Sequence, residues 1–249
     1  MKEINNSIIK LLSSLQMKKY RDAEGLFVAE GWKCVRDTWH AFNCRYLIAT
    51  RTWYERYGTA AHYDKLVMAG KSQMARMSQF TTPSDVIAVY EIPETTVDDA
   101  TVRKSLNIVL DNIQDPGNLG TIVRLADWFD IPYVFCGEGT VDIYNHKVVQ
   151  ATMGAIANVK VVYCDLDELF DDYPEMEVCG TFLDGENIFS SELPREGFVV
   201  FGNEGQGISA KIAERVSRRL LIPPASTRHA SDSLNVGLAA AITVAQFRK

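Results

Sequence analysis

The sequence has little of what a metal site, a disulfide framework or a membrane anchor requires. Its five cysteines are odd in number and show no C-x-x-C spacing, so neither disulfides nor a zinc site is expected. The four histidines are scattered, and no two share the spacing by which a helix presents metal ligands. No apolar run approaches the roughly 20 residues that span a bilayer, and residues 1–16 lack the apolar stretch of a signal peptide. We therefore expect a soluble, cytoplasmic protein that binds no metal.

Positive charge is also scarce, since the formal net charge is −6. This balance counts against nucleic-acid binding, because phosphate contacts need Lys and Arg. The charges are unevenly placed, however: residues 1–21 carry five basic residues against one acid, and residues 165–177 are strongly acidic. A local basic face can coexist with an acidic total. The best phosphate-contact candidates are Lys18, Lys19 and Arg21; the alternative is a solvated basic turn.

The length of 249 residues suits two small domains better than one, and 47% hydrophobic residues can fill both cores. Residues 1–92 alternate short strands and helices, which predicts a small α/β domain. Residues 93–105 contain Pro93 and few apolar residues, as is typical of a linker. We expect helices over 4–16, 32–41 and 52–57, a turn at 18–22, and strands over 26–29, 45–49, 65–68 and 86–90.

Residues 106–249 again alternate strands and helices, which predicts a mostly parallel sheet with helices on both faces. Ligands gather at the carboxyl ends of the strands in such sheets. Three segments join an expected strand to polar or glycine-rich sequence and are therefore candidate site segments. The expected strands are 106–110, 133–136, 159–163, 178–182, 198–201 and 220–222, and the expected helices are 118–129, 145–152 and 233–247.

The first segment is LDNIQDPGNLGTIVR, residues 110–124. Asn118 is expected to cap the following helix, after a Pro-Gly turn. Arg124 interrupts an apolar stretch close to two turns beyond Asn118, so both side chains can lie near one helix face. The guanidinium of Arg124 needs an acceptor, which is either a surface carboxylate or a phosphate or ribose.

The second segment is FVVFGNEGQGIS, residues 198–209. A buried strand runs into a loop with three glycines, and glycine permits close backbone approach to a ligand. The spacing is not G-x-G-x-x-G, so the segment is a poor dinucleotide fingerprint. A simple turn explains the glycines, but folding alone does not explain Glu204 between them.

The third segment is IPPASTRHASDSLNVGLAAAI, residues 222–242. Ser233 is the expected helix N-cap, and the alanine-rich run is a close-packed helix. This assignment leaves Asn235 inside the first turn, where Asn is a weak helix former.

Taken together and in this order, the three segments resemble the three motifs of the SpoU (TrmH) branch of the SPOUT methyltransferases. The first looks like the motif with Asn118 and Arg124, the second like the Gly-Glu-Gly loop, and SLNVGLAAAI like the SLNV motif. The match covers about residues 106–249. Residues 18–31 (KKYRDAEGLFVAEG) resemble the ribosomal-protein-like substrate-binding domain that precedes many SpoU enzymes.

The resemblance implies a catalytic domain with a C-terminal trefoil knot, a feature that periodicity does not predict because knots are very rare. Members of the family hold S-adenosylmethionine in the knot mainly through backbone groups. The matching positions in this chain are Gly202, Ile222 and Leu234. Members are also homodimers that pair near the knot, which implies that Arg124 acts across the dimer interface.

The chain departs from the family pattern between its second and third segments. Pro224 replaces the methionine that usually follows Ile-Pro, and the loop over residues 224–232 is longer than usual. This difference concerns the details of the cofactor contacts.

The activity implied by the resemblance is methyl transfer from S-adenosylmethionine to a ribose 2′-OH of RNA, with ribosomal RNA favoured over tRNA. The protein must align the hydroxyl and help to remove its proton. Asn118, with Ser233 or Asn235, is expected to orient the hydroxyl and to hold Arg124. Because Arg does not deprotonate in proteins, we assign Arg124 to the adjacent phosphate and to the developing alkoxide charge. Glu204 is expected to position Arg124 or another cation.

Two other functions fit parts of the sequence. A non-catalytic RNA-binding or ribosome-assembly protein would keep the fold, but the intact Asn118, Arg124, Glu204 and Asn235 speak against it. A nicotinamide-dependent dehydrogenase would need an early strand–GxGxxG–helix unit, which the sequence lacks.

Overall fold

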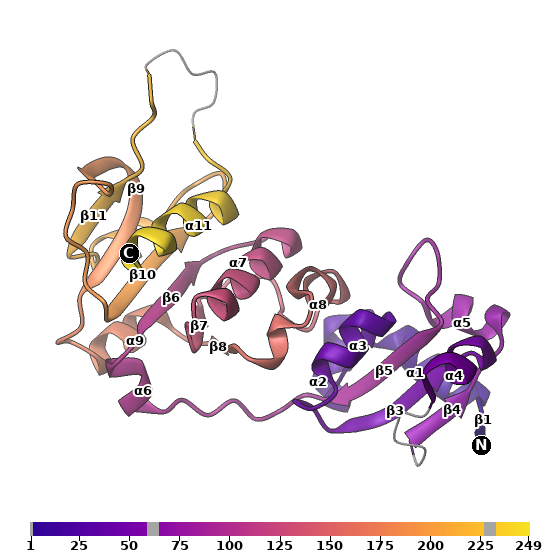
Figure 1. The fold of residues 1–249 in the computed structure, drawn as a ribbon. Coiled ribbons are helices and arrows are strands. Elements are labelled where there is room, and N and C mark those ends of the chain that lie inside the picture. The colour runs from indigo at the N-terminus through magenta and orange to yellow at the C-terminus, as the bar shows by residue number, and fades with distance from the viewer. Residues whose placement is uncertain (1, 59–64, 227–232) are drawn as a thin grey trace. The chain divides into compact units, whose positions relative to one another are not determined.

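The computed structural model describes residues 2–58, 65–226 and 233–249 (Figure 1). The chain forms two compact units: Met1–Glu94 with Asp142–Ala157, and Thr95–Val141 with Asn158–Lys249. The chain thus enters the second unit near the predicted linker. The expected uninterrupted domain over 106–249 differs from this division, because Asp142–Ala157 packs with the first unit. Among the described residues, no helix is long and apolar enough to cross a membrane.

The first unit is built on a mixed five-stranded sheet in the order β1-β4-β3-β5-β2. Strands β1, β4 and β3 are parallel, and β5 runs antiparallel to both β3 and β2. The strands are β1 (Lys2–Glu3), β2 (Leu26–Glu30), β3 (Cys44–Ala49), β4 (Leu66–Met68) and β5 (Val86–Glu91). The four strands predicted here are therefore confirmed, and β1 was not predicted.

The described residues of the first unit form the helices α1 (Asn6–Ser14), α2 (Lys18–Glu24), α3 (Trp32–Thr38), α4 (Arg51–Tyr57), α5 (Lys71–Met77) and α8 (His146–Thr152) and the 3-10 helix η3 (Ala155–Ala157). The prediction of a turn at 18–22 is wrong, because these residues form α2. The helix ends at Gly25, whose φ of 63° is the left-handed conformation that glycine adopts without strain. Buried side chains of α1 and α5, including Leu12 and Met74, pack against the sheet.

The second unit contains a six-stranded sheet in the order β11-β9-β10-β6-β7-β8, and every pair is parallel. This confirms the predicted α/β class. The strands are β6 (Leu106–Asp111), β7 (Tyr133–Cys136), β8 (Lys160–Tyr163), β9 (Val178–Asn187), β10 (Gly197–Gly202) and β11 (Arg218–Leu221). The helices are α6 (Asp99–Arg103), α7 (Pro116–Trp128), α9 (Leu166–Asp172), α10 (Ala210–Ala213) and α11 (Val236–Phe247).

Three of these helices were not predicted: α6, α9 and the short α10. Helix α6 lies inside the expected linker, and Val102 anchors it in the core of the second unit. Helix α9 lies in the acidic stretch, where Asp165 caps it by accepting hydrogen bonds from two backbone N–H groups. Burial of Leu169 and Phe170 from α9 offsets the cost of its many acidic residues. The trefoil knot implied by the family resemblance stays a prediction.

The sheet order of the second unit fixes where a ligand site can form. Strand β6 is flanked by β7 on one side and by β10 on the other, so the order of the strands reverses next to β6. Asp111, the last residue of β6, is in register with Gly202, the last residue of β10. The loops that follow these strands therefore lie side by side at the topological switch point, where open α/β sheets bind their ligands.

Candidate active site

The segment after β6 begins α7 with a cap that differs from the prediction. Asp115 is the N-cap, and its Oδ1 accepts a hydrogen bond from the backbone N–H of Asn118 at 2.8 Å. Pro116 occupies the first helical turn, where its missing N–H costs nothing. The prediction of Asn118 as the cap is wrong. Its side chain is instead available for contacts outside the helix, although only 9% of the residue is exposed.

A chain of side-chain hydrogen bonds joins all three predicted segments. The Nδ2 of Asn118 donates to Oε1 of Glu204 at 2.8 Å, and the Oδ1 of Asn118 accepts from Nδ2 of Asn235 at 2.9 Å. The Oδ1 of Asn235 accepts from the backbone N–H groups of Gly237 and Leu238. Each hydrogen bond fixes which end of the next side-chain amide is the oxygen and which is the nitrogen. The donors in this series of hydrogen bonds therefore all point from α11 toward the Glu204 carboxylate.

These contacts also explain the position of Asn235. It is the N-cap of α11, with an extended ψ of 136°, and the prediction of Ser233 in that role is wrong. Asn and Ser are equally good caps, and composition does not separate two candidates this close together. Ser233 is exposed at the start of the same segment.

The loop after β10 is a closed turn held to the loop after β6. Asn203 and Gly207 exchange two backbone hydrogen bonds, and a Cβ at Gly202 would overlap the backbone of Gly207. The side chain of Asn203 accepts from the N–H groups of Gly205 and Gln206 and donates to the backbone oxygen of Asn112 at 2.9 Å. Asn203 therefore ties the turn that carries Glu204 to the first segment.

The sequence analysis missed two residues, Asn112 and Asp111, that join the loop after β6 to the loop after β10. Asn112 adopts a φ of 60°, a left-handed conformation that Asn tolerates better than most residues. The buried carboxylate of Asp111 accepts from the backbone N–H of Ser209 at 2.7 Å. Their one signal in the sequence is their position directly after a buried strand, at the carboxyl edge of the sheet.

Arg124 lies apart from this chain of hydrogen bonds. It is exposed on α7, whereas Asn118 is buried. Contrary to what the sequence suggested, the two side chains therefore do not share one helix face. Within the described part of the chain, Arg124 makes no hydrogen bond or ion pair, and Glu204 contacts Asn118 instead. The expected contact from Glu204 to Arg124 is therefore absent from the described residues. No described residue occupies the guanidinium, so an external anion is a suitable partner for it.

The three candidate cofactor positions belong to the same edge of the sheet. Gly202 ends β10 and is buried, Ile222 follows β11 and is half-buried, and Leu234 precedes the α11 cap with 48% of its surface exposed. Strand β9 lies between β11 and β10 in the sheet. The hydroxyl of Thr181 on β9 donates a hydrogen bond to the backbone oxygen of Val200 on β10. Most of the unusual loop over 224–232 lies outside the described residues.

The three candidate RNA contacts in α2 differ in their surroundings. Lys18 is exposed and paired with Asp22 at 2.7 Å, and the ammonium of Lys19 lies 4.7 Å from the centroid of the Tyr20 ring. Arg21, by contrast, is only 3% exposed and forms an ion pair with Asp142. Its prediction as a phosphate contact is wrong, because its donors are already bound inside the first unit.

The fold and the site define a two-unit α/β protein whose second unit brings polar loop residues together at the carboxyl edge of a parallel sheet. Residues 105–245 match the SpoU rRNA Methylase family, and residues 6–88 match the MRM3-like substrate binding domain. The first match covers more than half of the chain. The protein therefore belongs to the SpoU rRNA Methylase family, which confirms the family resemblance.

Several known proteins are similar over most of the chain. The 23S rRNA (guanosine(2553)-2′-O)-methyltransferase RlmP of Bacillus subtilis is 33% identical over 73% of this chain and 71% of its own length. A TrmH-family RNA methyltransferase structure from Porphyromonas gingivalis is 37% identical, with a TM-score of 0.86 and 98% coverage of both chains. The SpoU methyltransferase AviRb of Streptomyces viridochromogenes, solved with AdoMet, shares the fold at 19% identity, with a TM-score of 0.84 and coverage of 98% and 97%.

Proposed function

We propose that this protein transfers the methyl group of S-adenosylmethionine to a ribose 2′-OH of RNA, and that the RNA is ribosomal. The observation that carries this proposal is the hydrogen-bonded chain from Asn235 through Asn118 to Glu204, which joins the three family segments at one site. Membership of the SpoU rRNA Methylase family and the similarity to RlmP support the same reaction and substrate class.

The residues at the carboxyl edge of the sheet fit S-adenosylmethionine. Ile222 and Leu234 offer apolar surface for an adenine ring, and Gly207 leaves open space where a side chain would stand. Backbone groups of the Gly202 turn would hold the polar parts of the molecule. When bound, S-adenosylmethionine supplies an electrophilic methyl group on a sulfonium ion, so the protein needs no metal for this chemistry.

The protein side chains would orient the hydroxyl and stabilise its developing charge. Asn118 and Asn235 have fixed amide directions and can hold the ribose hydroxyl in line with the methyl group. Glu204 keeps Asn118 in that direction. Arg124 would bind the phosphate next to the target ribose and stabilise the alkoxide as its proton leaves.

We further propose a homodimer that pairs through α7 and α11. Trp128 at the end of α7 is 84% exposed, and Leu234 and Leu238 beside and on α11 are 48% and 60% exposed. Large apolar side chains gathered on packed helices are typical of an interface between subunits. Arg124 is exposed on the same helix α7, which supports its action on RNA bound by the partner subunit.

A mixture of two inactive variants tests this arrangement. Arg124→Ala and Asn118→Ala proteins, each inactive, are expected to regain about one quarter of wild-type activity after subunits are exchanged by mild denaturation and refolding. A mixed dimer has one intact site only if Arg124 serves the partner's Asn118. The measurement is methyl incorporation into RNA, with each variant refolded alone as the control. A mixture as inactive as its parents would contradict action across the interface.

The first unit would bind the RNA. Residues 1–94 contain 13 Lys and Arg against 10 Asp and Glu, whereas residues 95–249 contain 13 against 22. Positive charge is therefore concentrated where the substrate-binding family model matches.

The five cysteines are all free thiols, which supports a reducing compartment such as the cytoplasm.

Titration calorimetry with S-adenosylmethionine or S-adenosylhomocysteine, with NADH as the control, tests the cofactor. Saturable binding of the first two alone supports the proposal. The reaction is then followed by tritium transfer from labelled S-adenosylmethionine to ribosomal RNA, where a 2′-O-methyl group blocks alkaline cleavage of the adjacent phosphodiester. A folded dimer that binds RNA but not the cofactor would favour a non-catalytic RNA-binding protein.

The tie between the two loops gives a second prediction. Asn203→Asp keeps an oxygen that accepts from Gly205 and Gln206 but cannot donate to Asn112 O, whereas Asn203→Ala loses all these bonds. Lost side-chain hydrogen bonds cost about 1 kcal/mol each, so S-adenosylmethionine affinity should fall about 5-fold in the aspartate variant and further in the alanine variant. Calorimetry measures both. Equal affinity in both variants and wild type would mean that the loop keeps its shape without Asn203.

A further inference from the structure

The first unit contains an aromatic cluster, formed by Trp32, Trp53 and Tyr57 with Arg56, that the methyl-transfer site does not use. We propose that this cluster binds an unstacked nucleobase of single-stranded RNA. The proposal rests on the proposed RNA substrate and adds the chemistry by which the first unit holds it.

The sheet of the first unit brings the members of the cluster to one edge. Strands β2 and β3 both run antiparallel to β5, so they point the same way and end at the same edge. The residues that follow them are anchored at the start of β5: Gly31 N–H donates to Val86 O, and Thr50 N–H donates to Asp85 O. Helices α3 and α4 begin immediately afterwards, and their first turns carry Trp32 and Trp53.

The rings form a stack that is buried at the Trp53 end and carries the positive charge of Arg56 at the other end. The centroids of Trp32 and Tyr57 are 4.9 Å apart at an interplanar angle of 26°, and Trp53 meets Trp32 edge-on at 5.2 Å. The guanidinium of exposed Arg56 lies over the Tyr57 ring, 5.2 Å from its centroid. Trp32 and Tyr57 are half-buried, whereas Trp53 is only 3% exposed.

Two observations separate this cluster from an ordinary piece of core. Among the described residues, Arg56 has no ion pair, whereas Arg51 on the same helix pairs with Glu55 at 3.0 Å. The indole N–H of Trp53 is buried and has no acceptor in the described part of the chain, although buried donors are nearly always paired. A nucleobase suits the cationic end of the cluster, because its flat face stacks on aromatic rings and guanidinium planes.

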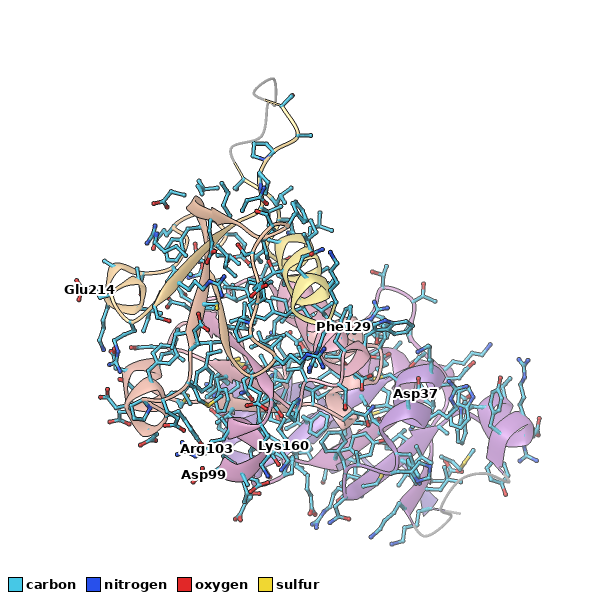
Figure 2. The ribbon with its side chains drawn as sticks, turned by 60° about the vertical axis from the view of Figure 1, so that its left-hand side comes forward. Asp37, Asp99, Arg103, Phe129, Lys160 and Glu214 are labelled. Atoms are coloured by element: carbon cyan, nitrogen blue, oxygen red, sulfur yellow. The ribbon has the colours of Figure 1, made fainter. Side chains whose placement is uncertain are left out.

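The charge beside the cluster suits the phosphates that flank such a base. Lys33 and Arg36 on α3 are more than half exposed and share one carboxylate, that of Asp37, at 3.0 and 2.8 Å. Asp37 is labelled on its helix in Figure 2. Two cations against one carboxylate leave a net positive charge on this helix. The cluster therefore combines stacking with phosphate attraction, as single-strand-binding surfaces do.

The test is fluorescence anisotropy of the full-length protein with labelled hexa-adenylate RNA, at one fixed ionic strength. Tyr57→Leu keeps apolar volume but removes the stacking face, and Arg56→Gln removes the cation without touching the core. Both variants are expected to bind the single strand about 10-fold more weakly than wild type. Tyr57→Phe, which keeps the ring, and Arg51→Gln, the matched control on the same helix, should stay within about 2-fold.

Three results would overturn the proposal: no wild-type binding of the single strand, equal binding of a duplex of the same sequence, or wild-type affinity in both Tyr57→Leu and Arg56→Gln. Thermal unfolding of each variant shows whether the first unit is folded, and Arg56→Gln keeps the test valid if the leucine variant is not. Calorimetry with S-adenosylmethionine on the same proteins separates the two hypotheses. If the wild-type protein binds the cofactor but not the single strand, only the proposed nucleobase site is refuted. If it binds the single strand but not the cofactor, only the proposed methyltransferase activity is refuted.

Discussion

Replacing Arg124 with alanine is expected to lower the rate constant of methyl transfer to RNA by about 10²–10³-fold while leaving S-adenosylmethionine binding unchanged. Arg124 is exposed on α7 and makes no hydrogen bond or ion pair within the described residues. Its removal therefore breaks no contact that holds the fold or the Gly202 turn. The effect is confined to the step in which negative charge develops on the ribose oxygen, and single-turnover methyl incorporation with saturating RNA measures that step.

Arg124→Lys separates charge from geometry. Lysine keeps a positive charge but lacks the planar fork that holds a phosphate by two parallel hydrogen bonds, so we expect activity between those of alanine and wild type. Arg195→Ala is the matched control, because Arg195 is exposed just before β10, at the amino edge of the same sheet. A rate constant that is unchanged in Arg124→Ala would refute the catalytic assignment. Loss of cofactor binding would instead assign Arg124 to the pocket.

The central strands of the second unit's sheet could be predicted because they are buried on both faces. Strands such as Leu106–Asp111 and Gly197–Gly202 are fully buried runs, which appear in the sequence as continuous apolar stretches. Helix α9 has the opposite character: four of its seven residues are acidic, and three buried side chains, Leu166, Leu169 and Phe170, hold it to the core. Composition alone favours a solvated loop there, whereas the Asp165 cap and the tertiary contacts together explain the helix.

The candidate site was predicted at the level of segments but not of atoms. The family resemblance placed Asn118, Glu204 and Asn235 in one site, and the hydrogen bonds bring these three together. The capping roles were assigned wrongly, because Asp115 and Asn235 compete with neighbours of equal capping strength and the backbone dihedrals decide between them. The direction of Glu204 toward Asn118 depends on the registered ends of β6 and β10, a long-range contact without a local sequence signal.

Arg21 is a second residue whose long-range contact could not be predicted from the local sequence. Three basic residues in succession, with only a tyrosine between them, predicted a phosphate-binding turn. The third basic residue is instead buried against Asp142, 121 positions later in the chain. No local pattern distinguishes it from Lys18 and Lys19. The misassignment also explains why the return of Asp142–Ala157 to the first unit was not predicted, because Arg21 is one of the contacts that hold this segment.

Replacing Arg21 with alanine is therefore expected to destabilise the first unit by about 3–5 kcal/mol, because it leaves a buried carboxylate without its partner. The guanidinium bonds Oδ2 of Asp142 through Nε at 3.0 Å and Nη2 at 2.5 Å, and Nη1 donates to the backbone oxygens of Leu15 and Gln16. The side chains of the pair are only 4% and 12% exposed. Urea unfolding followed by circular dichroism measures the change, and the two units can give separate transitions.

Two further variants show whether burial is the cause. Lys18→Ala breaks an exposed pair in the same helix, with side chains 62% and 55% exposed, and should cost less than about 1 kcal/mol. Asp142→Asn removes one charge but keeps an acceptor for Arg21, so its cost should lie between the two. Both variants of the buried pair should also speed tryptic cleavage after exposed Lys147, since they loosen the segment that α8 occupies. Equal stability of Arg21→Ala and Lys18→Ala would mean that the packing of α8 on β2, and not the ion pair, holds this segment in the first unit.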